Sequence, residues 1–188
     1  SPEAEETQSV NTIYFDDNKV VGQNTDIYGF ESSLKIAKYD VAKKKILILG
    51  AGGVVPSIIF ALNKMKASEI IISNRTRTKA ENLKKIFKNI KTVEWGEVPD
   101  FDLIINATSI GLNQKDKLNL NFSKTKKGKF FYDVIYNPKE TNFLKTGQML
   151  GNKTENGKKM FINQAAEAFR IWHGIDPEID NEVNELLD

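Results

Sequence analysis

Residues 45–53 read Lys45-Ile46-Leu47-Ile48-Leu49-Gly50-Ala51-Gly52-Gly53, so a run of four aliphatic residues stands directly before a glycine cluster. Such a run is typical of a strand buried on both faces of a sheet, and we expect a helix to follow it from about Val54 to Lys66. Glycines between a strand and a helix permit a tight turn and let free N–H groups approach a pyrophosphate. Val55 stands where the usual pattern has its third glycine, so a turn with packing glycines is the alternative interpretation.

The same alternation of strands and helices continues outward from this stretch. It predicts an α/β fold, a doubly wound parallel sheet of the Rossmann type, across residues 44–155. Before it we expect a hairpin around Asp16-Asp17-Asn18 and a helix capped by Asp26. The further expected strands are 69–73, 92–95, 103–105, 130–134 and one near Met149, and the further expected helices are 78–88 (capped by Thr78), 141–146, 159–173 and 177–187.

Composition excludes several classes of function. The 188 residues carry 27 basic and 25 acidic side chains, a net charge of +2, which gives no general reason to expect a nucleic-acid partner. The absence of cysteine and the single histidine exclude disulfides, thiolate sites and a zinc site, so no metal is expected. The uncharged stretch 46–62 is interrupted by glycines and a proline, and no signal peptide is visible. We therefore expect a cytoplasmic protein without a membrane partner.

The residues after the second expected strand indicate which dinucleotide binds. An NAD site places a carboxylate there, whereas this chain has Asn74-Arg75-Thr76-Arg77-Thr78-Lys79. Guanidinium and hydroxyl groups suit a 2′-phosphate, so these residues favour NADP(H), and Asn74, Arg75, Thr76, Arg77 and Lys79 are the candidate ligands. A solvated basic helix start is the alternative.

Three further segments carry candidate polar residues. Asn106-Ala107-Thr108-Ser109 follows a strand, at the edge where ligands bind in such sheets, although a small polar turn is equally compatible. Asn24-Thr25-Asp26 resembles a helix-capping segment. Gln164 shares an otherwise apolar helical stripe with Met160, Ala168 and Trp172, so it is either satisfied by backbone or directed at a ligand.

The order of these motifs resembles the shikimate dehydrogenase family, which includes quinate-using relatives. The resemblance runs from Val10 to about Pro177, and seven motifs in one order make it specific. They are Val10-Asn11-Thr12, Gly22-Gln23-Asn24-Thr25-Asp26, Gly50-Ala51-Gly52-Gly53, Asn74-Arg75-Thr76, Ile105-Asn106-Ala107-Thr108-Ser109, Tyr132-Asp133-Val134-Ile135-Tyr136-Asn137-Pro138 and Gln164-Ala165-Ala166.

The resemblance implies NADP-dependent reduction of 3-dehydroshikimate to shikimate by a two-domain enzyme. It implies that Asn11, Asp26, Tyr136 and Gln164 bind the substrate, that Asp26 partners a catalytic lysine, and that Gly157 lies at the nicotinamide. Val134 and Met160 are expected to bind the cofactor as well. The implied division is a remnant of the substrate-binding domain at 1–26, the NADP-binding domain with a linking helix at 27–155, and C-terminal helices at 156–188 that pack back toward the substrate domain.

Two departures from the family pattern affect the expected activity. In Gly157-Lys158-Lys159-Met160, Lys159 replaces a small residue close to the expected nicotinamide site. The family's catalytic lysine and a serine pair that grips the substrate carboxylate belong to a segment before Val10-Asn11-Thr12 that these 188 residues lack, so we expect the chain alone to be inactive. An NADP-sensing module, a quinate dehydrogenase or another Rossmann enzyme are the alternatives, and monomer and homodimer are both open.

Overall fold

A six-stranded parallel sheet organises the computed structural model, which describes residues 1–113 and 115–187. Its strand order is β5-β4-β3-β6-β7-β8, in which the chain reverses direction across the sheet between β3 and β6. This order confirms the predicted doubly wound α/β class. The strands are β3 (Lys45–Leu49), β4 (Glu69–Ser73), β5 (Ile90–Val93), β6 (Leu103–Asn106), β7 (Phe130–Asp133) and β8 (Lys153–Glu155).

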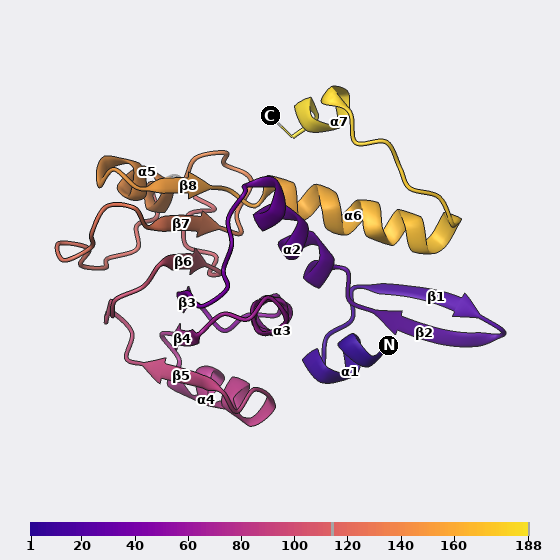
Figure 1. Ribbon diagram of the computed structural model, residues 1–188, viewed down its shortest axis with the longest axis horizontal. Coiled ribbons are helices and arrows are strands. Elements are labelled where there is room, and N and C mark those ends of the chain that lie inside the picture. Colours follow the sequence, from indigo (N-terminus) through magenta and orange to yellow (C-terminus); the bar gives the residue numbers. More distant parts are fainter. Residues whose placement is uncertain (114, 188) are drawn as a thin grey trace.

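Helices cover both faces of this sheet (Figure 1). Alternate residues of β3 enter two separate cores, because successive side chains of a strand point to opposite faces. Ile46 and Ile48 belong to the core beneath α2, α3 and α4, whereas Leu47 and Leu49 belong to the core beneath α5. The helices are α1 (Pro2–Thr7), α2 (Asp26–Ile36), α3 (Val55–Lys64), α4 (Arg77–Ile86), α5 (Asn142–Met149), α6 (Lys158–His173) and α7 (Asn181–Glu185).

A separate antiparallel hairpin, β1 (Thr12–Asp16) and β2 (Lys19–Gln23), extends away from the sheet beside α1 and the end of α6 (Figure 1). Its turn residues Asp17 and Asn18 have φ of 44° and 62°, which confirms the predicted turn. The Trp172 indole of α6 donates to the Ile13 carbonyl over 3.0 Å. The hairpin is thus attached to the helix that carries Gln164.

Helix α2 connects the hairpin to the sheet and is held from both sides. Buried Asn24 donates to the Ser57 hydroxyl of α3 over 2.9 Å, and the Ser33 and Tyr132 hydroxyls are 2.8 Å apart in the core. Tyr132 also meets Phe30 edge to face. These contacts fix the start of α2, where Asp26 lies.

The structure corrects several predicted boundaries. The cap of α2 is Thr25 rather than Asp26, which is the first helical residue, and the cap of α4 is Thr76 rather than Thr78. Strand β5 begins two residues earlier than predicted, because Ile90 pairs with Ile70 of β4. The expected strand near Met149 is the end of α5, and β8 begins only at Lys153. The expected helix 177–187 is limited to the short α7.

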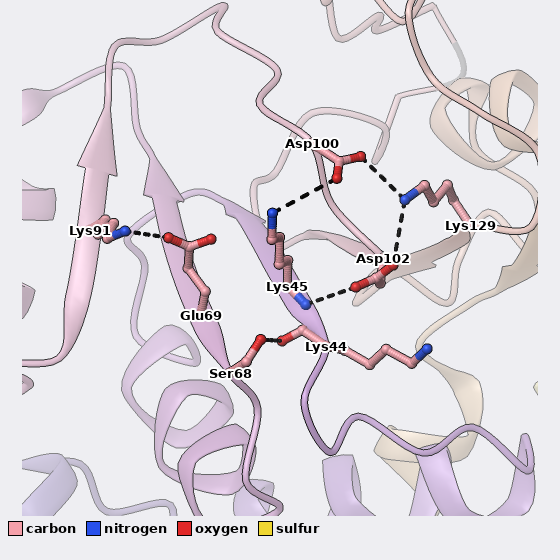
Figure 2. Close-up of polar contacts among 8 residues, drawn as sticks. All are labelled: Lys44, Lys45, Ser68, Glu69, Lys91, Asp100, Asp102 and Lys129. Carbon is pink, nitrogen blue, oxygen red and sulfur yellow. Dashed lines mark hydrogen bonds and ion pairs between the residues drawn. The ribbon is translucent and has the colours of Figure 1, made fainter.

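Ion pairs join the amino ends of the strands (Figure 2). Lys129 lies 3.3 Å from Asp100 and 3.4 Å from Asp102, and Lys91 pairs with Glu69. The Lys45 N–H donates to Asp102 over 3.0 Å, and this bond, with the nearby Lys129 charge, lowers the pKa of Asp102. Charges at the amino edge therefore balance one another within the protein.

None of the described helices is long and apolar enough to cross a membrane.

We expect Tyr132→Phe to lower the free energy of unfolding by about 0.5 to 1.5 kcal/mol, because it removes one buried hydrogen bond and leaves the ring in place. Urea denaturation measures the change. Ser33→Ala combined with Tyr132→Phe should cost less than the sum of the two single changes, and Tyr14→Phe in the hairpin is the control. Strict additivity of the two core changes would contradict the assigned hydrogen bond.

Candidate functional site

Two neighbouring cavities lie at the carboxyl edge of the sheet. The first, here called the cationic cavity, measures about 540 Å³ and is formed mainly by the segments that follow β3, β4 and β6. Ligands of doubly wound sheets bind at such a reversal of strand order. Its lining residues are Gly50, Ala51, Gly52, Asn74, Arg75, Thr76, Lys79, Trp95, Ala107, Thr108, Ser109, Ile110, Lys117 and Asn119.

The floor of the cationic cavity requires glycine at position 50. Gly50 has a φ of 110°, and a Cβ added there would lie 2.7 Å from the Ala107 carbonyl oxygen. Both the backbone conformation and the close approach of the β6 end therefore exclude a side chain. Backbone alone forms this part of the cavity, as an approaching pyrophosphate would need.

Positive charge is left unbalanced in the cationic cavity. Arg75, Lys79 and Lys117 line it, no carboxylate among the described residues does, and none of the three forms an ion pair with a described residue. Unlike the paired charges at the amino edge, these cations are available to an anionic ligand. The cavity is suited to a ligand that carries several phosphates.

Arg77 is not among the lining residues. Its guanidinium pairs with Glu94, beyond the end of β5, and lies 3.9 Å from Glu81 of its own helix. The structure therefore places the guanidinium of this predicted cofactor residue against Glu81 and Glu94, outside the lining of the cavity. The alternative interpretation of a basic helix start applies to Arg77, whereas Arg75 and Lys79 face the cavity.

Asn106 supports the cavity from behind rather than lining it. Its fully buried side chain donates to the Ile110 carbonyl and to Asp133, each over 3.1 Å, and accepts from the Thr108 hydroxyl over 2.7 Å. These bonds fold the segment after β6 so that Ala107, Thr108 and Ser109 line the cavity. The structure thus places Asn106 where it positions the lining segment, outside the lining itself.

Asp133 is a buried carboxylate that sequence reasoning did not single out. It accepts hydrogen bonds from the Thr141 hydroxyl over 2.6 Å, from the Ile135 N–H over 3.0 Å and from Asn106. Burial nevertheless raises its pKa to about 6, because the hydrogen bonds only partly offset the loss of water. Asp133 thus fixes both the β6 and β7 ends.

The second cavity measures about 380 Å³ and lies between the start of α2, the end of β7 and the start of α6. It brings together residues that are widely separated in the sequence, including every predicted substrate ligand. Its lining residues are Asn11, Asp26, Val54, Val134, Tyr136, Gly157, Met160, Phe161 and Gln164.

The amide of Asn11 is oriented toward Asp26. Its Oδ1 accepts from the Thr25 N–H over 2.9 Å and from the Thr25 and Thr12 hydroxyls, so its NH₂ group is left to donate. Burial raises the pKa of Asp26, and the hydrogen bond from Asn11 opposes this rise. The pair presents a half-buried carboxylate with a spare acceptor position to the cavity.

Both alternatives predicted for Gln164 apply, since its side chain is bonded to backbone and also lines a cavity. It lines the second cavity, yet its Nε2 donates to the Phe161 carbonyl over 3.0 Å and its Oε1 lies 3.4 Å from the Thr25 hydroxyl. Tyr136 stacks on Phe161 with ring centroids 4.5 Å apart. The two side chains are thus oriented by the protein before any ligand binds.

Gly157 must also be glycine, because a Cβ there would lie 2.0 Å from the Val134 carbonyl oxygen. This close approach brings the start of α6 against the end of β7. Lys159, expected to crowd this region, is directed away and pairs with Glu155 over 2.8 Å. The departure from the family pattern at position 159 therefore does not obstruct the second cavity.

Sequence reasoning missed four residues of the cationic cavity, namely Trp95, Ile110, Lys117 and Asn119. Their segments lack a glycine-rich motif. The alternation of polar and apolar residues in Lys117-Leu118-Asn119-Leu120 was the available signal for two of them. Gly53 lies between residues of the two cavities without lining either, and no group of three or more metal-ligating side chains occurs among the described residues.

Comparison with known families gives two matches. The model described as shikimate / quinate 5-dehydrogenase matches residues 31–142, and the model described as shikimate 5′-dehydrogenase C-terminal domain matches residues 159–181. The first covers more than half of the chain.

Curated and solved relatives agree with these matches. The NADP(+) shikimate dehydrogenase of Pelagibacter ubique is 60% identical over all 188 residues, which span 71% of that protein. The shikimate dehydrogenase structure of Aquifex aeolicus superposes with a TM-score of 0.90 at 36% identity, over 100% of this chain and 70% of that one. The structure of the shikimate 5-dehydrogenase of Thermus thermophilus, solved with NADP(H) and shikimate, superposes with a TM-score of 0.85 at 32% identity. The match covers 95% of this chain and 67% of that one. The chain thus spans about two thirds of the length of these relatives.

Asp133 should make stability depend on pH. The folded protein holds this proton up to about pH 6, whereas an unfolded aspartate releases it near 3.8, so the free energy of unfolding falls as pH rises through that window. The two pKa values correspond to a fall on the order of 3 kcal/mol. Urea denaturation at pH 4 and pH 7 measures the free energies of unfolding. From pH 4 to pH 7, the stability of Asp133→Asn relative to the wild type should rise by about this amount. An equal difference at both pH values would contradict the assignment, and Asp176→Asn, at an exposed carboxylate, is the control.

Proposed function

The chain belongs to the shikimate dehydrogenase family, and from that premise we propose that it binds NADP(H) and acts in the NADP-dependent interconversion of 3-dehydroshikimate and shikimate. One observation carries the proposal: a cavity with three unpaired cations adjoins a cavity that holds Asn11, Asp26, Tyr136 and Gln164. The printed names of the relatives agree with it, and the Thermus relative holds both ligands.

The loop from Gly50 to Val54 joins the two cavities, since Gly52 lines the first and Val54 lines the second. A dinucleotide laid along this loop has its adenosine end at Asn74, Arg75, Thr76 and Lys79. Its nicotinamide end then lies at Val134, Gly157 and Met160. The absence of a carboxylate after β4 favours a 2′-phosphate over a free ribose hydroxyl.

NADPH supplies the hydride for the reduction. The chain's own residues bind and orient the ketone beside it. Asn11 and Asp26 hydrogen-bond the substrate hydroxyls, and Tyr136 and Gln164 line the rest of the second cavity. Burial raises the pKa of Asp26, and the hydrogen bond from Asn11 opposes this rise. As a carboxylate, Asp26 accepts a hydrogen bond from a substrate hydroxyl and orients the substrate.

Reduction of a ketone leaves a developing alkoxide that needs a proton donor. An ionised Asp26 does not supply that proton alone. The family resemblance assigns the donor to a lysine that precedes the Val10-Asn11-Thr12 motif, with Asp26 as its partner. Residues 1–26 accordingly contribute to the substrate side, 27–155 to the nucleotide side, and 156–188 return to the substrate side. We place this reaction in the cytoplasm.

Quinate is the second candidate substrate, because the matching family model is described for both shikimate and quinate dehydrogenases. Comparing kcat/KM for shikimate and quinate in the oxidative direction distinguishes the two. An NADP-sensing module is the alternative without chemistry, and turnover by the protein encoded by the complete reading frame excludes it.

Arg75→Ala should weaken NADP⁺ binding by roughly 1.5 to 3 kcal/mol, the range for a hydrogen bond to a charged group, with little effect on NAD⁺. Isothermal titration calorimetry with both nucleotides measures this. Arg77→Ala is the matched control, since Arg77 pairs with Glu94 outside the cavity. Equal affinity of the wild type for NADP⁺ and NAD⁺ would refute the cofactor assignment.

Asp26→Asn should reduce kcat/KM for shikimate by about 10²- to 10⁴-fold while NADP⁺ affinity is retained. Activity of the wild type should fall as pH drops through the raised pKa of Asp26, because protonation removes the acceptor. Assays of the protein encoded by the complete reading frame across pH 4–9 test both expectations.

The variant should lack that acidic limb of the pH profile. Asp17→Asn, at the exposed hairpin turn, is the control and should behave as the wild type. An Asp26→Asn enzyme with kcat/KM within threefold of the wild type would refute the catalytic role.

A further inference from the structure

Part of the wall of the cationic cavity belongs to residues 116–120, a segment without regular secondary structure in the connection between β6 and β7. Its side chains alternate. Leu118 and Leu120 are partly buried against the core beneath α5, whereas Lys117 and Asn119 line the cavity. Lys117 and Asn119 therefore face the cavity while the two leucines anchor the segment on the core.

This segment is attached to the fold at its start. The Asn142 side chain, at the first turn of α5, donates to the Asp116 carbonyl over 2.8 Å. Trp95 packs against the same core as Leu118 and Leu120 and also lines the cavity. The segment and Trp95 thus share one core and one cavity.

Lys117 brings a charge that the protein does not balance. Its ammonium group forms no ion pair with a described residue, and the adjacent Asp116 is not among the lining residues. Arg75 and Lys79 contribute the other two cations from the segment after β4. Three like charges around one cavity repel one another unless an anion binds among them.

We propose that Lys117 is a specificity-determining residue that binds the 2′-phosphate of the dinucleotide together with Arg75 and Lys79. The proposal rests on the proposed NADP(H) function and extends it to a residue outside the motif after β4. The 2′-phosphate is favoured over the pyrophosphate because the other two cations of the cavity, Arg75 and Lys79, come from the segment after β4, whereas the pyrophosphate belongs at the glycine loop after β3. Asn119, two residues further, lines the same cavity.

Calorimetry with four probes tests this role: NADP⁺, NAD⁺, adenosine 2′,5′-bisphosphate and 5′-AMP. Lys117→Ala should weaken NADP⁺ and the bisphosphate by about threefold to tenfold, the effect of one partly exposed charge pair, and leave NAD⁺ and 5′-AMP within twofold. Lys117→Glu should weaken the first two further. Lys115→Ala is the matched control, because Lys115 is an exposed lysine of the same connection that does not line the cavity.

The outcomes separate the two proposals. Unchanged NADP⁺ affinity in both Lys117 variants would overturn the inference while leaving the proposed function intact. Equal weakening of NADP⁺ and NAD⁺ would also overturn it, since that result places Lys117 at the pyrophosphate. A wild type that binds neither NADP⁺ nor the bisphosphate would refute the proposed function itself. Near-identical thermal unfolding of all variants would show that the affinity changes do not arise from misfolding.

Discussion

Parallel pairing of all six strands is the constraint on which the rest of the molecule depends, because it places every strand's carboxyl end at one edge of the sheet. The two edges differ in charge balance. At the amino edge, Lys129 is paired with Asp100 and Asp102. At the carboxyl edge, Arg75 and Lys79 have no carboxylate partner among the described residues. Paired charges thus lie at one edge and unpaired cations at the other.

The carboxyl edge is shaped by buried polar residues that no ligand need touch. Asp133 and Asn106 join the ends of β7 and β6 and direct the following segments toward the cavities. A carboxylate kept without water costs free energy, as the raised pKa of Asp133 reflects. Three hydrogen bonds offset part of that cost and hold two loops in one arrangement.

Helices α2 and α6 provide the second half of the site. They pack against each other, so Asp26 at the start of one and Gln164 on the other meet at the same cavity although 138 positions separate them. The hairpin supplies Asn11, whose amide orientation is fixed by Thr25 and Thr12. Polar recognition at this site therefore depends on three elements that are held together by burial of α2 against the sheet.

The sequence by itself determined the fold class, the nucleotide loop and the family. These follow from local patterns: four aliphatic residues before Gly50, a basic segment after the second strand, and motifs in a fixed order. It also identified Asp26, Tyr136 and Gln164, which the structure brings into one cavity. Each of these motifs consists of a few neighbouring residues. It can therefore be recognised without knowing where the segment lies in the folded protein.

Only the tertiary structure decided which polar side chains face the two cavities. Arg75 and Arg77 are two residues apart, yet Glu94 beyond β5 takes up Arg77 and leaves Arg75 in the cavity. Lys159 likewise pairs with Glu155 instead of lining the second cavity, and the buried Asn106 side chain donates to Asp133. Lys117 joins the site because leucines on either side of Asn119 pack on a core that forms from distant segments. A charged or amide side chain points toward the partner that tertiary packing brings close to it. That partner comes from a distant part of the sequence, so no local pattern specifies it.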